Sequence, residues 1–306
     1  MNTSSSVDSV QKHPDHLNSP WRRFSREFVR SKTAIFGLSV LLILLLCATF
    51  APWITPQDPY DLLQLDVLDA RLPPGSEGFG GFTYWLGTDD QGRDLFSAIL
   101  YGLRISLTVG IGSAIVAMIL GTLVGLIAAH VGGRVESIIM RIVDLQLSFP
   151  SILVALMLLA VLGKGVVNVV LALIIVEWAY YARTVRSAAI VERQREYIEA
   201  AKGLGIPSHR VMLRHLLPNC MPPVIVIGTM QIARAIALEA TLSFLGLGVP
   251  ITEPSLGLLI ANGYQYMMSG MYWISLFPGV MLLVTIVAIN LVGDQLRDVL
   301  NPKLSH

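Results

Sequence analysis

Five ionisable residues lie inside long apolar stretches of the sequence, and they are the side chains there most able to do chemistry. They are Arg141, Asp144, Glu177, Arg234 and Glu239. A charged group away from water is costly, so such residues usually face a cavity, an opposite charge or a molecule in transit. Arg141 and Asp144 are three residues apart, so a helix would bring them together as an ion pair.

The second pair of opposite charges has a different spacing. Arg234 and Glu239 are five residues apart, which is about 140° around an α-helix, so they do not pair within one helix. They either line a path for a molecule carrying both charges or lock helices together, and both interpretations stay open. Glu177 is followed closely by three aromatic residues, which suits a membrane edge or the lining of a cavity.

The common catalytic motifs are missing from the sequence. There is no GxxxxGK[ST] phosphate loop, no HExxH, no CxxC and no nucleophile elbow. Cys47 and Cys220 are expected at opposite faces of a membrane, too far apart for a disulfide. We therefore predict no catalytic residue, no metal site and no cofactor bound by this chain. Its energy would come from an ion gradient or from a partner protein.

The composition indicates the elements that position these residues. Of 306 residues, 54% are hydrophobic and only 14% are charged, too few charges to cover a soluble globule. A bilayer core about 30 Å thick needs roughly 20 apolar residues in a helix. The sequence predicts an all-α, polytopic membrane protein with six transmembrane helices, at 34–54, 105–131, 138–162, 166–182, 224–247 and 272–292.

The distribution of charge predicts the orientation in the membrane. Lys and Arg gather in the N-terminal tail, in 183–217 and after the last span, whereas the segment after the first span is acidic. Basic loops stay in the cytoplasm, so both termini are expected there. The predicted organisation is a partly disordered cytoplasmic tail, a first transmembrane helix, an external segment, a five-helix core and a cytoplasmic tail, at 1–33, 34–54, 55–104, 105–293 and 294–306.

Segment 183–217 is long for an internal loop of a six-span protein. No proline interrupts 179–206, so a helix can continue from the fourth span. Gly203 and Gly205 suit the end of that helix. Pro207 then suits the first turn of a second helix over about 208–217, which we expect to end before Pro218. The predicted product is a helix, a glycine bend and another helix at the membrane surface.

This segment resembles the EAA motif of ABC importer permeases. The matching residues are Glu199-Ala200-Ala201, then Gly205, then Leu217 and Pro218, although His215 stands where the family usually has Ile. Other stretches are similar to the oligopeptide/dipeptide permease family, specifically its C-type subunit. They are 87–94 (GTDDQGRD), 140–144, 149–150 (FP), 242–248 (LSFLGLG) and 277–298.

The resemblance implies a function and a set of partners. The EAA segment would be a coupling helix that docks on an ATPase subunit, with the contact formed by Glu199, Ala200, Ala201, Gly203, Leu204 and Gly205. The partners implied are a homologous B-type permease, two ATP-binding subunits that hold ATP and Mg²⁺, and a periplasmic or surface substrate-binding protein. The chain would lie in the bacterial inner membrane and carry dipeptides or short peptides, although family members also carry glutathione or nickel chelates.

Two other classes of protein compete with this interpretation. A self-contained ion-coupled carrier often has internal inverted repeats, and we find no clear repeat between 34–162 and 166–292. An intramembrane enzyme is disfavoured by the missing catalytic motifs.

Overall fold

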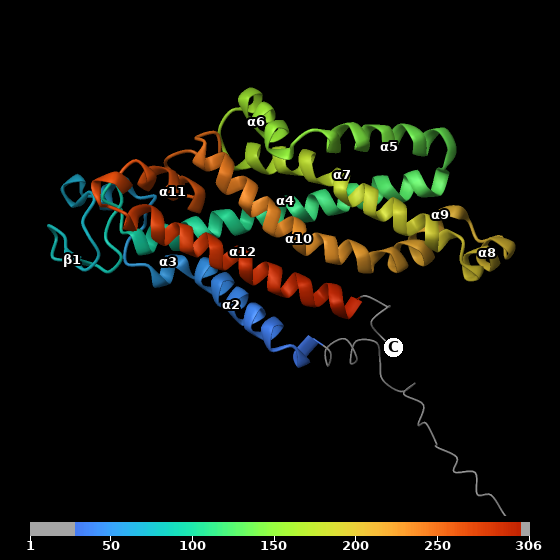
Figure 1. Cartoon of the computed structure of the whole chain (residues 1–306), viewed down its shortest axis with the longest axis horizontal. Helices are drawn as coiled ribbons and strands as arrows, with labels where there is room; N and C mark the ends of the chain where they lie inside the picture. Colours follow the sequence, from blue (N-terminus) through green and yellow to red (C-terminus); the bar gives the residue numbers. More distant parts are fainter. Residues whose placement is uncertain (1–27, 301–306) are drawn as a thin grey trace, which may run out of the picture.

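The computed structural model describes residues 28–300, which form a bundle of long helices (Figure 1). Within that range, five helical stretches are long and apolar enough to cross a membrane. They are α2 (Lys32–Thr49), α4 (Leu95–Val131), α7 (Val166–Arg193), α10 (Leu217–Phe244) with the short turns before it, and α12 (Trp273–Leu300). The disorder predicted for the N-terminal tail falls largely on residues outside the described range.

Helix α4 lies at the centre of the bundle. It packs against α7 and α10, while α12 packs between α2 and α10. A Cβ atom on Gly125 would lie 3.0 Å from the Cβ atom of Val185, and one on Gly121 would lie 3.0 Å from the backbone nitrogen of Ala182. Because these distances are too short for packed atoms, only glycine lets the two backbones approach this closely.

Smaller elements cover the two ends of the bundle (Figure 1). One end, which we call the hairpin end, carries α3 (Ala51–Ile54), η2 (Leu62–Gln64), η3 (Val67–Asp69), the antiparallel strands β1 (Ser76–Glu77) and β2 (Thr83–Tyr84), α11 (Leu256–Tyr264) and η5 (Met267–Ser269). The other end, the α8 end, carries α8 (Glu196–Gly203), α9 (Ser208–Val211) and the π-helical turn η4 (Met212–Leu216). The bundle therefore holds these two sets of elements far apart.

The third predicted span is not one helix. It is divided into α5 (Gly133–Ser148) and α6 (Ser151–Leu162), which are bent by 92° relative to each other. Pro150 lacks an N–H group and forces the residue before it out of the helical region, and Phe149 has extended backbone angles. The expectation of a continuous helix over 138–162 was therefore wrong, and the bent pair counts as one broken span at most.

Four helices are longer than the hydropathy pattern predicted; among them, α10 begins at Leu217 rather than 224, and α12 ends at Leu300 rather than 292, inside the predicted C-terminal tail. Helix α4 begins at Leu95, so residues 95–104 of the predicted external segment are helical. Asp94 caps it by accepting hydrogen bonds from the backbone nitrogen and the hydroxyl of Ser97, at 2.8 and 2.5 Å. Helix α7 continues past residue 182 to Arg193. The extension of α7 carries charged residues that lower its hydropathy, whereas residues 95–104 are mostly apolar and are separated from the predicted span only by Arg104.

A buried ion pair fastens the hairpin end to the bundle. Arg93 Nε lies 2.6 Å from Asp89 Oδ2, and both side chains are at most 1% exposed. Asp89 Oδ1 also accepts the backbone N–H of Arg93 at 3.0 Å. Arg93 Nη1 donates to the carbonyl of Ile251 in the α10–α11 connection at 3.4 Å. The pair thus ties two segments that are distant in sequence.

We predict that Arg93→Gln strongly destabilises the chain. Removing one partner leaves the Asp89 carboxylate buried without its counter-charge, which costs about 3–5 kcal/mol. Thermal unfolding of the purified chain in detergent checks this, with Arg71→Gln as the control, because the Arg71 side chain is exposed and lies over the ring of Tyr266 at 5.3 Å. Equal unfolding midpoints for the two variants would contradict the role of the pair.

Candidate functional site

Helix α8 ends in a turn that requires glycine. Gly205 has a φ of +71°, a conformation that other residues adopt only at a cost. The backbone N–H of Leu204 donates to the carbonyl of Ala200 at 3.0 Å, and that of Ile206 donates to the carbonyl of Ala201 at 3.2 Å. This is the hydrogen-bond pattern of a helix closed by a left-handed residue. The glycine bend predicted from the sequence is confirmed.

The two alanines of the EAA motif face in different directions. Ala201 is only 5% exposed and packs with Ile198, Ile206 and Val211 in a small apolar cluster between α8 and α9. Ala200, about 100° away around the helix, is exposed. The sequence had placed both alanines on one docking surface, whereas in the structure Ala201 holds α8 against α9.

The exposed side of α8 and its following turn forms a single surface. We call it the α8 surface, and it consists of Glu199, Ala200, Gly203 and Leu204. Leu204 is 80% exposed, so its apolar side chain is free to contact another surface. Small residues beside an exposed apolar side chain let another protein approach closely.

The chain passes from α9 into α10 without leaving a helical conformation. The turn η4 has π-helical hydrogen bonding, and Leu217 N–H donates to the carbonyl of Met212. Pro218 then falls in the first turn of α10, where its missing N–H costs nothing. The expectation that the second helix ends before Pro218 was therefore wrong, and α8 is joined to α10 through α9 and η4.

Tyr197 fixes the base of α8 to the two long helices beside it. Its hydroxyl donates to Glu192 Oε1 of α7 at 2.6 Å and accepts from Asn219 Nδ2 of α10 at 3.0 Å. Burial, together with the Glu192 carboxylate, raises the pKa of Tyr197 to about 12. The hydroxyl therefore stays protonated at neutral pH and keeps donating to Glu192.

The spacing of Arg141 and Asp144 predicted an ion pair between them, but the structure shows that they do not pair. The Asp144 carboxylate pairs instead with Arg183 of α7. A second pair joins Glu136 of α5 to Arg186 of α7 at 2.5 Å, and the Arg141 side chain is exposed. The longer course of α7 explains the difference, because it brings two arginines alongside α5.

Arg234 and Glu239 have separate partners on other helices, consistent with their spacing. Arg234 donates from Nη2 to the hydroxyl of Ser151 of α6 at 3.0 Å, and its guanidinium lies 4.5 Å from the centre of the Tyr180 ring of α7. The Glu239 carboxylate accepts hydrogen bonds from Ser106 of α4 at 2.8 Å and from Ser243 at 2.7 Å. The two charges of α10 therefore connect it to three other helices.

Glu177 is fully buried rather than at an exposed aromatic edge. Neither of its carboxylate oxygens accepts a hydrogen bond from any described residue. It does not line any of the pockets described for this chain. Its place in the bundle is therefore a packed position between helices.

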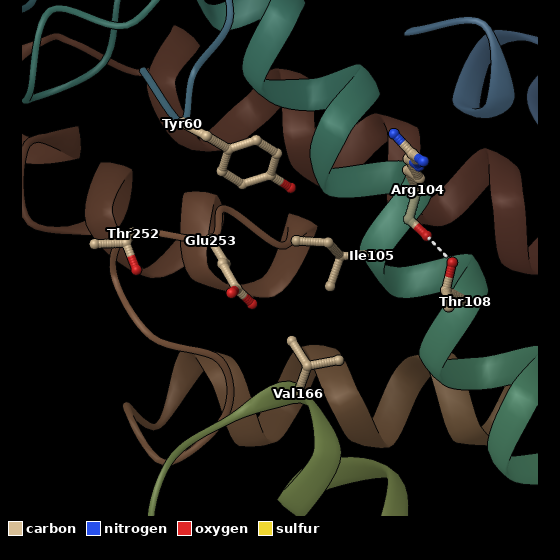
Figure 2. A pocket seen from close by; sticks show the side chains of 7 residues that line it. All are labelled: Tyr60, Arg104, Ile105, Thr108, Val166, Thr252 and Glu253. Atoms are coloured by element: carbon tan, nitrogen blue, oxygen red, sulfur yellow. Dashed lines mark hydrogen bonds between the residues drawn. The ribbon is translucent and has the colours of Figure 1, made fainter. Parts of the chain in front are cut away.

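A pocket of about 550 Å³ opens at the hairpin end (Figure 2). Its walls come from four parts of the chain: the segment before η2, helix α4, the start of α7 and the α10–α11 connection. The lining residues are Tyr60, Arg104, Ile105, Thr108, Val166, Thr252 and Glu253. The sequence did not reveal this pocket, because no local motif links the four parts. Its only signal was Arg104, a basic residue at the edge of a span on the otherwise acidic side.

The pocket presents two opposite charges on either side of a tyrosine. In Figure 2 the ring of Tyr60 projects between Glu253 and Arg104. Burial raises the pKa of Tyr60 to about 12; the Glu253 carboxylate adds to this rise and the Arg104 guanidinium opposes it. The Tyr60 hydroxyl is thus neutral at physiological pH, and it lies within electrostatic range of both Glu253 and Arg104.

The fold resembles that of a chain in a solved ABC transporter. An inward-facing structure of the MetNI methionine ABC transporter superposes with a TM-score of 0.56; it covers 68% of this chain and 98% of that chain at 19% identity. At this identity the likeness concerns the fold. Together with the five or six helices able to cross a membrane, it confirms the prediction of an all-α, polytopic fold.

Residues 121–306 match the family described as binding-protein-dependent transport system inner membrane component, and residues 19–74 match the N-terminal TM domain of oligopeptide transport permease C. The chain belongs to this family of transport permeases. It is 39% identical to the di/tripeptide transport system permease protein DppC of Pseudomonas aeruginosa, over 94% of each chain. It is 38% identical to the glutathione transport system permease protein GsiD of Pectobacterium atrosepticum, over 94% of this chain and 93% of that one. The family resemblance seen in the sequence is confirmed, and the comparisons do not support an ion-coupled carrier.

We predict that leucine is tolerated at Ala200 but not at Ala201. Extra methyl groups at Ala201 would overpack the cluster with Ile198 and Val211, at a cost of about 1–3 kcal/mol, whereas at Ala200 they would meet solvent. Hydrogen–deuterium exchange of the purified chain measures this, with faster exchange in α8 expected for Ala201→Leu only. Similar exchange in both variants would contradict the packing described for α8.

Proposed function

We propose that this chain is the C-type permease subunit of an ATP-driven importer of dipeptides or short peptides. The observation that carries the proposal is the α8 surface, held on two long helices by the Tyr197 hydrogen bonds and carrying an exposed leucine. The substrate class rests on relatives that are named as peptide permeases and that match nearly the whole chain.

The α8 surface is the proposed contact with a separate ATPase subunit. Glu199, Ala200, Gly203 and Leu204 would form the contact, Gly205 would set the bend and Ala201 would support α8 from within. The apolar Leu204 side chain would be buried on docking, which favours association by removing apolar area from water. ATP and Mg²⁺ would be bound in that partner, and this chain would contribute no catalytic residue.

Movement of α8 would reach the membrane through α10. A helical connection resists compression, so closure of two ATPase subunits would displace η4 and α10 rather than fold a loop. Arg234 and Glu239 would pass the displacement to α4, α6 and α7 through the contacts described above. ATP would then drive the cycle because the ATP-bound ATPases bind one conformation of the permease better than the other.

The proposed orientation follows from charge. The α8 end, with its arginines, would face the cytoplasm together with both termini, and the hairpin end would be external and receive substrate from a binding protein. The domain organisation proposed is a cytoplasmic tail, α2 as the first span, an external segment now ending near residue 94, the five-helix core and a C-terminal tail. A homologous B-type permease would supply the other half of the translocation path.

The polar residues of the bundle differ in their suitability for the path. Glu239 is locked between serines, Asp144 is paired with Arg183 and Glu177 is enclosed, so these three suit interhelical roles. Arg234 is partly exposed beside the α5–α6 bend, and Arg141 is exposed. Arg234 is therefore the proposed path residue among them.

We predict that Gly205→Val disrupts assembly with the ATPase subunits while leaving membrane insertion intact. A β-branched residue at a φ of +71° is strained by at least about 1–2 kcal/mol, so the turn would reorganise and α8 would point elsewhere. Co-purification of the ATPase subunits with the tagged chain measures this. Gly205→Asn is the matched control, since asparagine has a similar size and tolerates this conformation. If both variants retain the ATPase subunits equally, the bend does not position the contact.

We predict that the chain transports no peptide by itself. In liposomes, uptake of a labelled dipeptide should require the companion permease, both ATPase subunits, the binding protein and ATP, since this chain supplies no means of using energy alone. Substrate-stimulated ATP hydrolysis by the full complex, measured across dipeptides, longer peptides and glutathione, identifies the substrate. Uptake by the lone chain under a proton or sodium gradient would overturn the proposal.

A further inference from the structure

The pocket at the hairpin end has no role in the coupling described above. Its lining residues Tyr60, Thr252 and Glu253 belong to the hairpin end, and Figure 1 shows that end opposite α8. The pocket's volume of about 550 Å³ is within the range of roughly 300–1,000 Å³ that small-molecule sites occupy. Its walls combine rigid helix, from Arg104 to Thr108 of α4, with the connection that holds Thr252 and Glu253.

The charges of this pocket are not used by the protein itself. Among the described residues, the Arg104 guanidinium and the Glu253 carboxylate each have no hydrogen-bond or ion-pair partner, unlike Asp89 with Arg93 or Glu136 with Arg186. The two groups carry opposite charges, and both act electrostatically on the Tyr60 hydroxyl. The pocket therefore holds one charge of each sign near the same ring. A ligand with one group of each sign would satisfy both.

The uncharged lining favours a ligand with an apolar body. Ile105 and Val166 form an apolar wall, and the Tyr60 ring, itself packed edge-on against Tyr101 at 5.1 Å, projects opposite them (Figure 2). The hydroxyl groups of Tyr60 and Thr252 add donors and acceptors. An inorganic ion would use only one of the two charges, whereas a short peptide has a carboxylate, an ammonium group, an amide bond and side chains.

We propose that this pocket is a receiving site for a zwitterionic short peptide, with Arg104 binding its terminal carboxylate and Glu253 binding its terminal ammonium group. The inference rests on the proposed function as a peptide importer and names the external site where substrate first meets this subunit. Tyr60 would cover the peptide bond between the two ends, since its ring lies between the two charged residues. Contacts of this kind are charge-assisted hydrogen bonds, which are stronger than neutral ones.

The test uses the assembled importer and labels the pocket directly. Thr252 is replaced by the photoreactive residue benzoylphenylalanine in the complete complex, and radiolabelled alanyl-leucine is supplied with and without the binding protein. The same peptide is also supplied with an acetylated amino end or an amidated carboxyl end. Arg104→Gln and Glu253→Gln are compared with Arg71→Gln and Glu77→Gln, which remove the same charges elsewhere in the external segment.

The expected pattern links each variant to one end of the peptide. Arg104→Gln should lower labelling by the free peptide about tenfold, the usual effect of losing a hydrogen bond to a charged group, and should not change labelling by the amidated peptide. Glu253→Gln should show the same loss with the free peptide and no change with the acetylated one. The Arg71 and Glu77 variants should label like the parent complex.

Other outcomes overturn the inference in distinguishable ways. If the parent complex transports the dipeptide but the probe at position 252 is not labelled, the pocket proposal fails and the proposed function stands. If Arg104→Gln and Glu253→Gln lower labelling equally for all three peptides, and only when the binding protein delivers them, the residues contact that protein instead. If the parent complex transports no peptide at all, the proposed function itself fails.

Discussion

Helices α4 and α7 approach each other backbone to backbone at Gly121 and Gly125, and the other elements take their positions from that contact. A side chain at either position would separate the two helices. Because α7 is held there, its arginines pair with α5 and its end supports α8 through Tyr197. The far end of α4 carries Arg104 into the pocket. One close contact thus positions both ends of the molecule.

Hydropathy predicted the number and order of the spans because burial in lipid requires long apolar helices, and this physical requirement is visible in composition alone. It did not predict their ends, since Arg104 separates the apolar first turns of α4 from the rest of that span, and the last turns of α7 are polar and pair with α5. The bend at Pro150 follows from a local rule for proline, but its angle of 92° depends on packing against α7.

The candidate site was likewise predicted only in part from the sequence. The EAA motif located α8 and its bend from local sequence, because Gly205 is required by backbone conformation. The different burial of Ala200 and Ala201 depends on which side of α8 meets Val211, a contact that the motif does not encode. The pocket at the hairpin end has no signature in the local sequence, since Tyr60, Arg104 and Glu253 meet only through the tertiary fold. The Asp144 pairing was wrong for the same reason.

The π-helical turn between α9 and α10 has a consequence for direction. In a regular α-helix each residue advances the chain by about 100° around the axis and only about 1.5 Å along it. A wider turn at Met212–Leu216 therefore changes the direction of α8 around the axis of α10 far more than its position along that axis. The direction in which the α8 surface faces therefore depends on this turn together with the Gly205 bend and the Tyr197 hydrogen bonds.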